Sequence, residues 1–175
     1  MSAALPRSLT LAIHPSPRGF GWIAFASPFN PHDWGTVYVR GAQARNQRCL
    51  RRIERILDRL NPEMLLLEDF ETRRSSRRAR IRELGRAIMA LASTKGIDVV
   101  VISIGEVRGC FAKVGARTRD DIAETAARQF ECLRHLLPRR RRAWHSEHPR
   151  MALFCAVAVA MTHYQLSAVS LLALL

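Results

Sequence analysis

The stretch Ala12-Ile-His14-Pro-Ser16-Pro-Arg-Gly19-Phe-Gly21-Trp22 decides the fold that we expect for this chain. It begins inside a short apolar run, residues 9–14, that stops at a proline, as a buried strand does. Residues 15–19 have the composition of a turn, and residues 20–26 then predict a second strand. The chain therefore opens with two strands joined by a tight turn, and His14 stands at the end of the first.

The rest of the chain alternates between strand-like and helix-like patterns. Residues 64–67 are an apolar run closed by Glu68 and Asp69, which is typical of a buried strand with acids at its C-terminal end. The other expected elements are a strand over 34–40, a helix over 43–60, a helix over 77–92, a strand over 97–102, a helix from Thr118 to Pro138, and a last helix from Ser146. This order predicts one α/β domain over residues 1–175, with a five-stranded mixed sheet whose first three strands are antiparallel and which helices flank.

Three segments, in this order, carry a resemblance to a known family. The opening stretch is similar to a first-strand motif in which an aspartate and a proline lead through a glycine-containing turn into an aromatic strand. Leu65-Leu-Leu-Glu68-Asp69 resembles an acid-tipped fourth strand, and Ser146-Glu147-His148 precedes a helix rich in small residues. Together they resemble the RuvC-type Holliday-junction resolvases, which have the RNase H-like fold.

The resemblance implies a phosphodiester hydrolase with two divalent ions, magnesium or manganese, held by carboxylates. Carried over by position, its catalytic residues are Glu68, Glu147 and His14. His14 stands in place of an aspartate, and Arg150 falls where a second acid of the last helix would lie. The catalytic motif is therefore degenerate, since histidine does not bridge two metal ions as a carboxylate does.

Two interpretations of this altered site remain open. In the first, His14, Glu68, Glu147 and His148 hold a single metal ion, since histidine with carboxylates suits zinc, manganese or nickel. In the second, His14 is a partly buried histidine hydrogen-bonded to Glu68, and the site has lost its metal.

The charge of the chain points to a polyanionic partner. Lysine and arginine number 28 against 15 acidic residues, which gives a formal net charge of +13. Lys95 and Lys113 are the only lysines. A GC-rich genome would explain the choice of arginine over lysine, but not the excess of positive charge. Nucleic acid is the leading candidate partner.

The arginines gather in three groups. One follows the acid-tipped strand and predicts a phosphate-binding surface: Arg73, Arg74, Arg77, Arg78, Arg80 and Arg82. The second predicts either a loop that clamps the nucleic-acid backbone or a disordered basic loop: Arg139, Arg140, Arg141 and Arg142. The third lies along the helix over 43–60, and we expect it to be mostly a solvent face that pairs with Glu54 and Asp58.

Three aromatic side chains, Trp144, Phe20 and Phe111, could stack on bases, although each residue type is more often found in the core. The four cysteines show no CxxC pair and no zinc spacing. With no signal-peptide pattern at the start of the sequence, we expect a cytoplasmic location. The apolar segment 151–175 is interrupted at residues 162–165, which favours a buried helix over a membrane span.

These observations predict a RuvC-like protein that recognises branched DNA. Cleavage as a metal-dependent endonuclease is one form of this hypothesis. The alternatives are a catalytically inactive DNA-binding or assembly subunit and an RNA-binding protein on the same fold. By analogy with dimeric junction resolvases, the helix over 149–175 is the expected homodimer surface.

Overall fold

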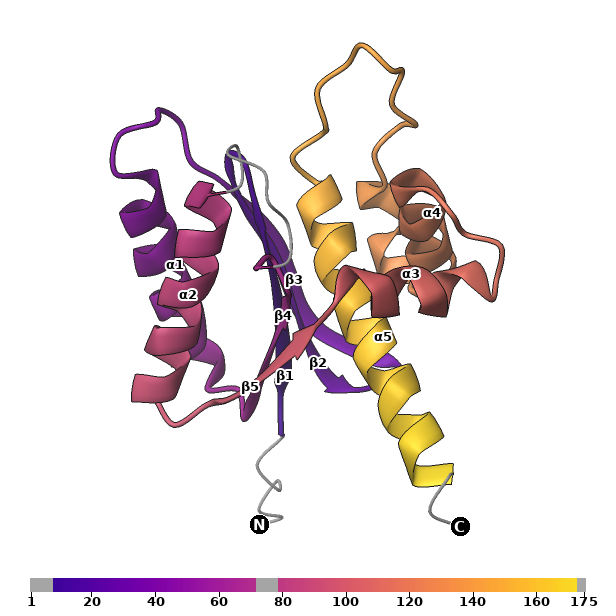
Figure 1. The fold of residues 1–175 in the computed structure, drawn as a ribbon, viewed down its shortest axis with the longest axis horizontal. Coiled ribbons are helices and arrows are strands. Elements are labelled where there is room, and N and C mark those ends of the chain that lie inside the picture. The colour runs from indigo at the N-terminus through magenta and orange to yellow at the C-terminus, as the bar shows by residue number, and fades with distance from the viewer. Residues whose placement is uncertain (1–7, 72–78, 173–175) are drawn as a thin grey trace.

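The computed structural model describes residues 8–71 and 79–172, which fold around one five-stranded sheet (Figure 1). The strands follow the order β3-β2-β1-β4-β5 across the sheet. Neighbours β1–β2 and β2–β3 are antiparallel, whereas β1–β4 and β4–β5 are parallel. The bounds are β1 (Thr10–Ser16), β2 (Gly19–Ser27), β3 (Asn30–Tyr38), β4 (Met64–Glu68) and β5 (Asp98–Ile102). The predicted five-stranded mixed sheet is confirmed.

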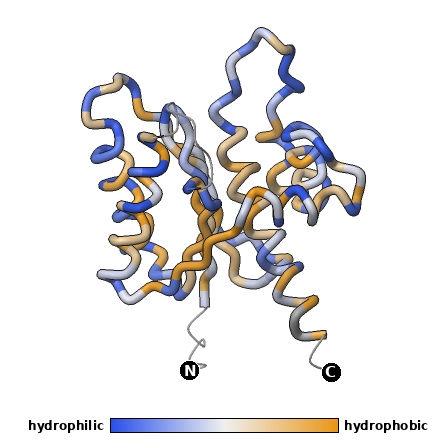
Figure 2. The backbone as a smooth tube through the Cα atoms, viewed as in Figure 1, coloured by the Kyte–Doolittle hydropathy of each residue, from blue (hydrophilic) through white to orange (hydrophobic). Residues whose placement is uncertain are grey.

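Helices cover both faces of the sheet and give it two apolar cores. One face carries α1 (Arg45–Leu60) and α2 (Ala79–Thr94). The other carries α5 (Met151–Leu172), with α3 (Ile104–Ala112), α4 (Arg119–Gln129) and the 3-10 helix η2 (Glu131–Leu136) beside it. Figure 2 shows hydrophobic residues concentrated in the strands and hydrophilic ones along the loop between η2 and α5.

Three helices differ from the sequence prediction. The last helix begins at Met151 and not at Ser146. Its first turn is formed after Pro149, because the residue before a proline is disfavoured in the helical conformation. The helix α3 was not expected, although Ser103 and Glu106 form a capping box at its start. Thr118 and Asp121 form a capping box at the start of α4, which ends at Gln129 and not at Pro138, and η2 continues the segment.

Gly21 sets how closely α5 approaches the sheet. A Cβ atom at this position would lie 2.1 Å from the backbone carbonyl carbon of Ala152 and 2.1 Å from the backbone nitrogen of Leu153. Gly21 pairs with His14 in the β1–β2 register. The helix therefore comes closest to the sheet beside His14, which places the next turn of α5 over the end of β1.

Most of α5 belongs to the core of the domain. Its first three turns are almost entirely buried against the sheet, and the buried Thr162 hydroxyl donates to the Ala158 carbonyl one turn earlier (2.8 Å). Among the described residues, one segment, Met151–Val169, is long and apolar enough to cross a membrane, and half of it is buried inside the fold. The core helix of a soluble protein passes the same test, so this feature alone is weak evidence for a membrane span.

Candidate functional site

His14 and Glu68 meet at the adjoining ends of two parallel strands. The β1–β4 register pairs Ile13 with Leu67, so the next residue of each strand lies at the same edge of the sheet. Both side chains are buried, with 5% of His14 and 6% of Glu68 exposed. His14 Nδ1 lies 3.3 Å from Glu68 Oε2, an ion-pair distance without the alignment of a hydrogen bond. The strands thus bring together the first two of the predicted site residues.

The third member of this cluster is Cys155, on the turn of α5 above His14. The Cys155 thiol lies beside the His14 imidazole, and the Phe70 ring meets the imidazole edge-on with 5.6 Å between the ring centroids. Burial alone would lower the pKa of His14, but Cys155 and Glu68 together raise it from 6.5 to about 10. The raised pKa favours the imidazolium form of His14, whose Nδ1 faces the Glu68 carboxylate in a buried pair.

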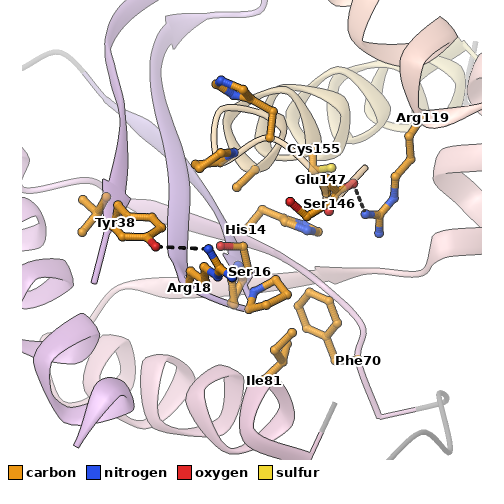
Figure 3. A pocket seen from close by; sticks show the side chains of 16 residues that line it. His14, Ser16, Arg18, Tyr38, Phe70, Ile81, Arg119, Ser146, Glu147 and Cys155 are labelled. Atoms are coloured by element: carbon orange, nitrogen blue, oxygen red, sulfur yellow. Dashed lines mark hydrogen bonds and ion pairs between the residues drawn. The ribbon is translucent and has the colours of Figure 1, made fainter. Parts of the chain in front are cut away.

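A second ion pair closes the same site from the other side. Arg119, at the start of α4, donates through Nη1 to Oε1 of Glu147 at 2.6 Å (Figure 3). Burial opposes the charge of Arg119, yet the nearby Cys155 and Glu147 raise its pKa above the ordinary value, with a smaller contribution from Glu68. Sequence reasoning missed Arg119, because only the fold brings the start of α4 to the end of β1.

His14, Cys155, Phe70, Arg119 and Glu147 line a cavity of about 470 Å³, whereas Glu68 lines a separate hollow. Figure 3 shows His14, Cys155, Ser146 and Glu147 pointing into it from three separate segments, with Arg119 beside them. Arg18, in the β1–β2 turn, completes the rim and donates to the Tyr38 hydroxyl at 3.3 Å. The cavity is thus mixed in charge, because it contains the Arg119–Glu147 ion pair and the His14 imidazole, whose Nδ1 faces Glu68.

The donor set does not fit a metal centre. Over residues 8–71 and 79–172, no three His, Cys, Asp or Glu side chains gather in a way that could hold a metal ion. The four predicted ligands illustrate why. His14 Nδ1 faces Glu68 at 3.3 Å, and Arg119 pairs with Glu147. His148 Nδ1 accepts a hydrogen bond from the backbone N–H of Arg150 (3.2 Å).

The positions of α5 that face the cavity also differ from the prediction. Because the helix begins at Met151, Arg150 lies outside it and is exposed. The residues that line the cavity from α5 are Ala152 and Cys155, three positions apart on one helical face. Neither supplies an oxygen ligand, so the last helix contributes no carboxylate to this site.

The arginines predicted to bind nucleic acid fall into different environments. Arg73, Arg74, Arg77 and Arg78 lie outside the described residues. Arg80 donates to the carbonyls of Ser16 (2.8 Å) and Pro17 (2.7 Å) and to the side chain of Asn46 (2.7 Å), so its guanidinium holds the β1–β2 turn. Arg82 is half-buried on the first turn of α2.

The loop over 138–150 presents its arginines to a groove of about 940 Å³. Arg140 donates to Glu124 (2.6 and 2.9 Å) and to Asp121 (2.8 Å), and these carboxylates raise its pKa. The exposed side chains of Arg139, Arg141 and Arg142 also line the groove and have no acidic partner among the residues that the structure describes. Arg140 therefore anchors the loop, while three arginines remain available to a ligand.

The aromatic predictions divide in the same way. Phe20 and Phe111 are fully buried in the two cores. Trp144 is 74% exposed on the arginine loop, where the Arg142 guanidinium lies 5.8 Å from its ring centre. Of the three aromatic side chains, only Trp144 is placed where it could meet a base.

Comparison with solved structures identifies the fold as RuvC-like. The structure of Thermus thermophilus RuvC in complex with a Holliday-junction substrate superposes with a TM-score of 0.68 at 18% identity, covering 93% of this chain and 96% of that one. A second Thermus thermophilus RuvC structure gives a TM-score of 0.63 at 19% identity over the same shares. At the level of sequence, no protein-family model and no curated protein matches the chain. The predicted RuvC-like, RNase H-like fold is confirmed.

Proposed function

We propose that this protein binds branched DNA through phosphate contacts and does not cut it by metal-dependent hydrolysis. The observation that carries the proposal is the content of the site. On a RuvC-like fold, His14 and Arg119 neutralise the two predicted catalytic carboxylates, while unpaired arginines line the adjoining groove.

The groove and the cavity together offer one continuous surface to a ligand. Arg119, Ser146, Glu147 and His148 line both hollows, so a phosphate chain that enters over the arginine loop reaches the mouth of the cavity. Arginine forms bidentate contacts with phosphate oxygens. Trp144 stands beside this path and offers a stacking surface for an unpaired base near a branch point.

Branched DNA is the ligand that the resemblance favours. The Thermus thermophilus protein with which this chain shares its fold was solved with a Holliday junction. Loss of the metal site would leave such a fold with its binding surface, which depends on charge and shape and not on catalysis. The proposal includes a cytoplasmic location.

The predicted homodimer is part of the same proposal, on a smaller surface than expected. The first turns of α5 are occupied by the core. Its C-terminal end carries the exposed apolar residues Leu166, Val169 and Leu172. We propose this end of the helix, and not its whole length, as the contact with a second copy.

Replacing Arg139, Arg141 and Arg142 together with glutamine is expected to weaken DNA binding and to reduce its salt dependence. Each lost phosphate contact lowers the slope of log K against log salt by about 1, so the triple variant should lose about 3 from the slope. Fluorescence anisotropy with a four-way junction at several salt concentrations measures both quantities.

The matched control replaces Arg108, Arg128 and Arg134 with glutamine. These residues are exposed on α3, α4 and η2 and line neither the cavity nor the groove. It removes the same charge and should change the slope far less. An equal loss in both variants would mean that total charge, and not the groove, governs binding, and the proposal would fail.

A further inference from the structure

A second basic hollow lies on the opposite side of the β1–β2 turn. Its volume is about 470 Å³, and it is lined chiefly by Tyr38, Arg40 and four arginines of α1: Arg48, Arg51, Arg52 and Arg55. We call it the α1 groove. Among the described residues, no acidic side chain lines it.

The acids of α1 are engaged elsewhere, contrary to the expectation of internal pairing. Glu54 and Asp58 face Lys95, at 3.8 and 2.5 Å from its Nζ. Arg59 pairs with Asp33 of β3 at 2.6 Å. Within the described parts of the chain, Arg51, Arg52 and Arg55 make no salt bridge. Both acidic side chains of α1 therefore lie outside the groove and leave its arginines without a carboxylate from their own helix.

The spacing of these arginines concentrates their charge along one face. Positions 48, 51, 52 and 55 follow the i, i+3, i+4, i+7 pattern of a single helical stripe. The opposite stripe is buried, and it contains Cys49, Ile53, Ile56 and Leu57. Like charges at these separations repel one another and destabilise the helix by a few tenths of a kcal/mol per pair. A bound polyanion would remove that repulsion.

One of the arginines already fixes the shape of the groove. Arg48 Nη2 donates to the carbonyls of Gly41 (3.2 Å) and Gln43 (2.9 Å), which holds the segment between β3 and α1 against the helix. Arg40, Arg51, Arg52 and Arg55 are exposed around it. The groove is thus a preformed hollow with movable cationic side chains at its edge.

The α1 groove is joined to the cavity through one residue. Tyr38 is 40% exposed and lines both hollows, and its hydroxyl accepts a hydrogen bond from Arg18 on the cavity rim. The surface thus runs from the arginine loop, across the cavity mouth, and past Tyr38 onto α1. Its two ends lie on opposite faces of the sheet, since α1 and the loop before α5 are on different sides (Figure 1).

We propose that the α1 groove binds the phosphate backbone of a second arm of the same branched DNA, and that this contact gives the protein its preference for branched over linear DNA. A straight duplex that lies along the arginine loop does not turn around the sheet edge without bending, which costs energy. Arms that diverge from a branch point reach both faces without that cost. The inference rests on the proposed function.

The test compares two ligands, a four-way junction and a linear duplex of the same total length and base composition. In the first variant, Arg51, Arg52 and Arg55 are replaced by glutamine. It should lower the affinity for the junction at least about tenfold and reduce the salt slope by about 3, while the affinity for the linear duplex changes less than about threefold. All three residues are exposed, and thermal unfolding checks that the variant folds.

The arginine-loop variant and the Arg108/Arg128/Arg134 control separate the possible failures. If the loop variant weakens junction binding and the α1 variant does not, the second-arm contact is wrong and the proposed function stands. Equal weakening of junction and duplex by the α1 variant also overturns the inference, because the groove then gives no selectivity. If the unaltered protein binds neither ligand, the proposed function itself fails and the α1 inference with it.

Discussion

Replacing Glu68 with alanine is expected to lower the free energy of unfolding at pH 6 to 7 by about 3–5 kcal/mol, the usual cost of removing one partner from a buried ion pair. The change leaves the imidazolium of His14 in the core without the carboxylate that faces it at 3.3 Å. Urea denaturation followed by circular dichroism measures the loss.

The sign of this effect distinguishes two kinds of site. If Glu68 belonged to a cluster of metal-binding carboxylates, its removal from the metal-free protein would relieve repulsion and raise stability. The ion pair predicts a decrease. Glu71→Ala is the control, because Glu71 forms a surface ion pair with Arg86 at 2.6 Å and should cost less than about 1 kcal/mol.

The stability difference should also depend on pH in one direction. The pKa of His14 is raised from 6.5 in the unfolded chain to about 10 in the folded protein. The stabilisation that Cys155 and Glu68 together give is therefore complete below about pH 6.5 and disappears as the pH rises through 10, and Glu68→Ala removes the part that Glu68 contributes. The difference in the free energy of unfolding between the unaltered protein and Glu68→Ala should become smaller over this interval. A difference that stays constant from pH 6 to pH 10 would contradict the ion pair.

Replacing Gly21 with alanine is expected to destabilise the protein by about 3 kcal/mol or more, at the upper end of the cost of overpacking a core. The added methyl group meets the backbone of Ala152 and Leu153 at 2.1 Å. A backbone cannot rotate away as a side chain can, so α5 must shift from the sheet. Because Cys155 lies on the next turn, the shift should also disturb its contact with His14.

Gly109→Ala is the matched control for this substitution. Gly109 lies within α3, and a Cβ atom there meets nothing within 4 Å. Alanine should stabilise this position by up to about 1 kcal/mol through its helix propensity. Thermal unfolding of both variants gives the comparison. A mild effect at Gly21 would mean that α5 packs less closely over His14 than described.

The parts of the fold that the sequence predicted are those set by local patterns. Short apolar runs predicted the strands and helical spacing predicted α1, α2 and α4, and Glu68 was correctly placed at the end of a buried strand. The order of these elements was enough to predict the sheet topology, because crossover connections follow few rules.

The site was less predictable, since its chemistry depends on contacts between distant segments. His14 and Glu68 were expected to meet, because both end parallel neighbouring strands. Arg119 has no sequence signal for its position, and only the packing of α4 against α5 brings it to Glu147. The last helix begins at Met151, so Arg150 lies outside it and Cys155 lines the cavity.

The α1 arginines illustrate the same limit. Glu54 and Asp58 lie in the right sequence positions to pair with arginines of their own helix. The fold places Lys95 next to them, and Lys95 forms ion pairs with both acids. The groove became a candidate binding surface only because of this long-range contact.

The most direct test of the central claim measures binding and cleavage of a four-way junction by the unaltered protein, first with EDTA and then with magnesium or manganese at matched ionic strength. Our account predicts the same Kd in all three conditions and an intact junction on a denaturing gel. Cleavage that requires the metal ion and disappears in Glu68→Gln would contradict it, because Glu68 would then be a metal ligand and not the partner of His14.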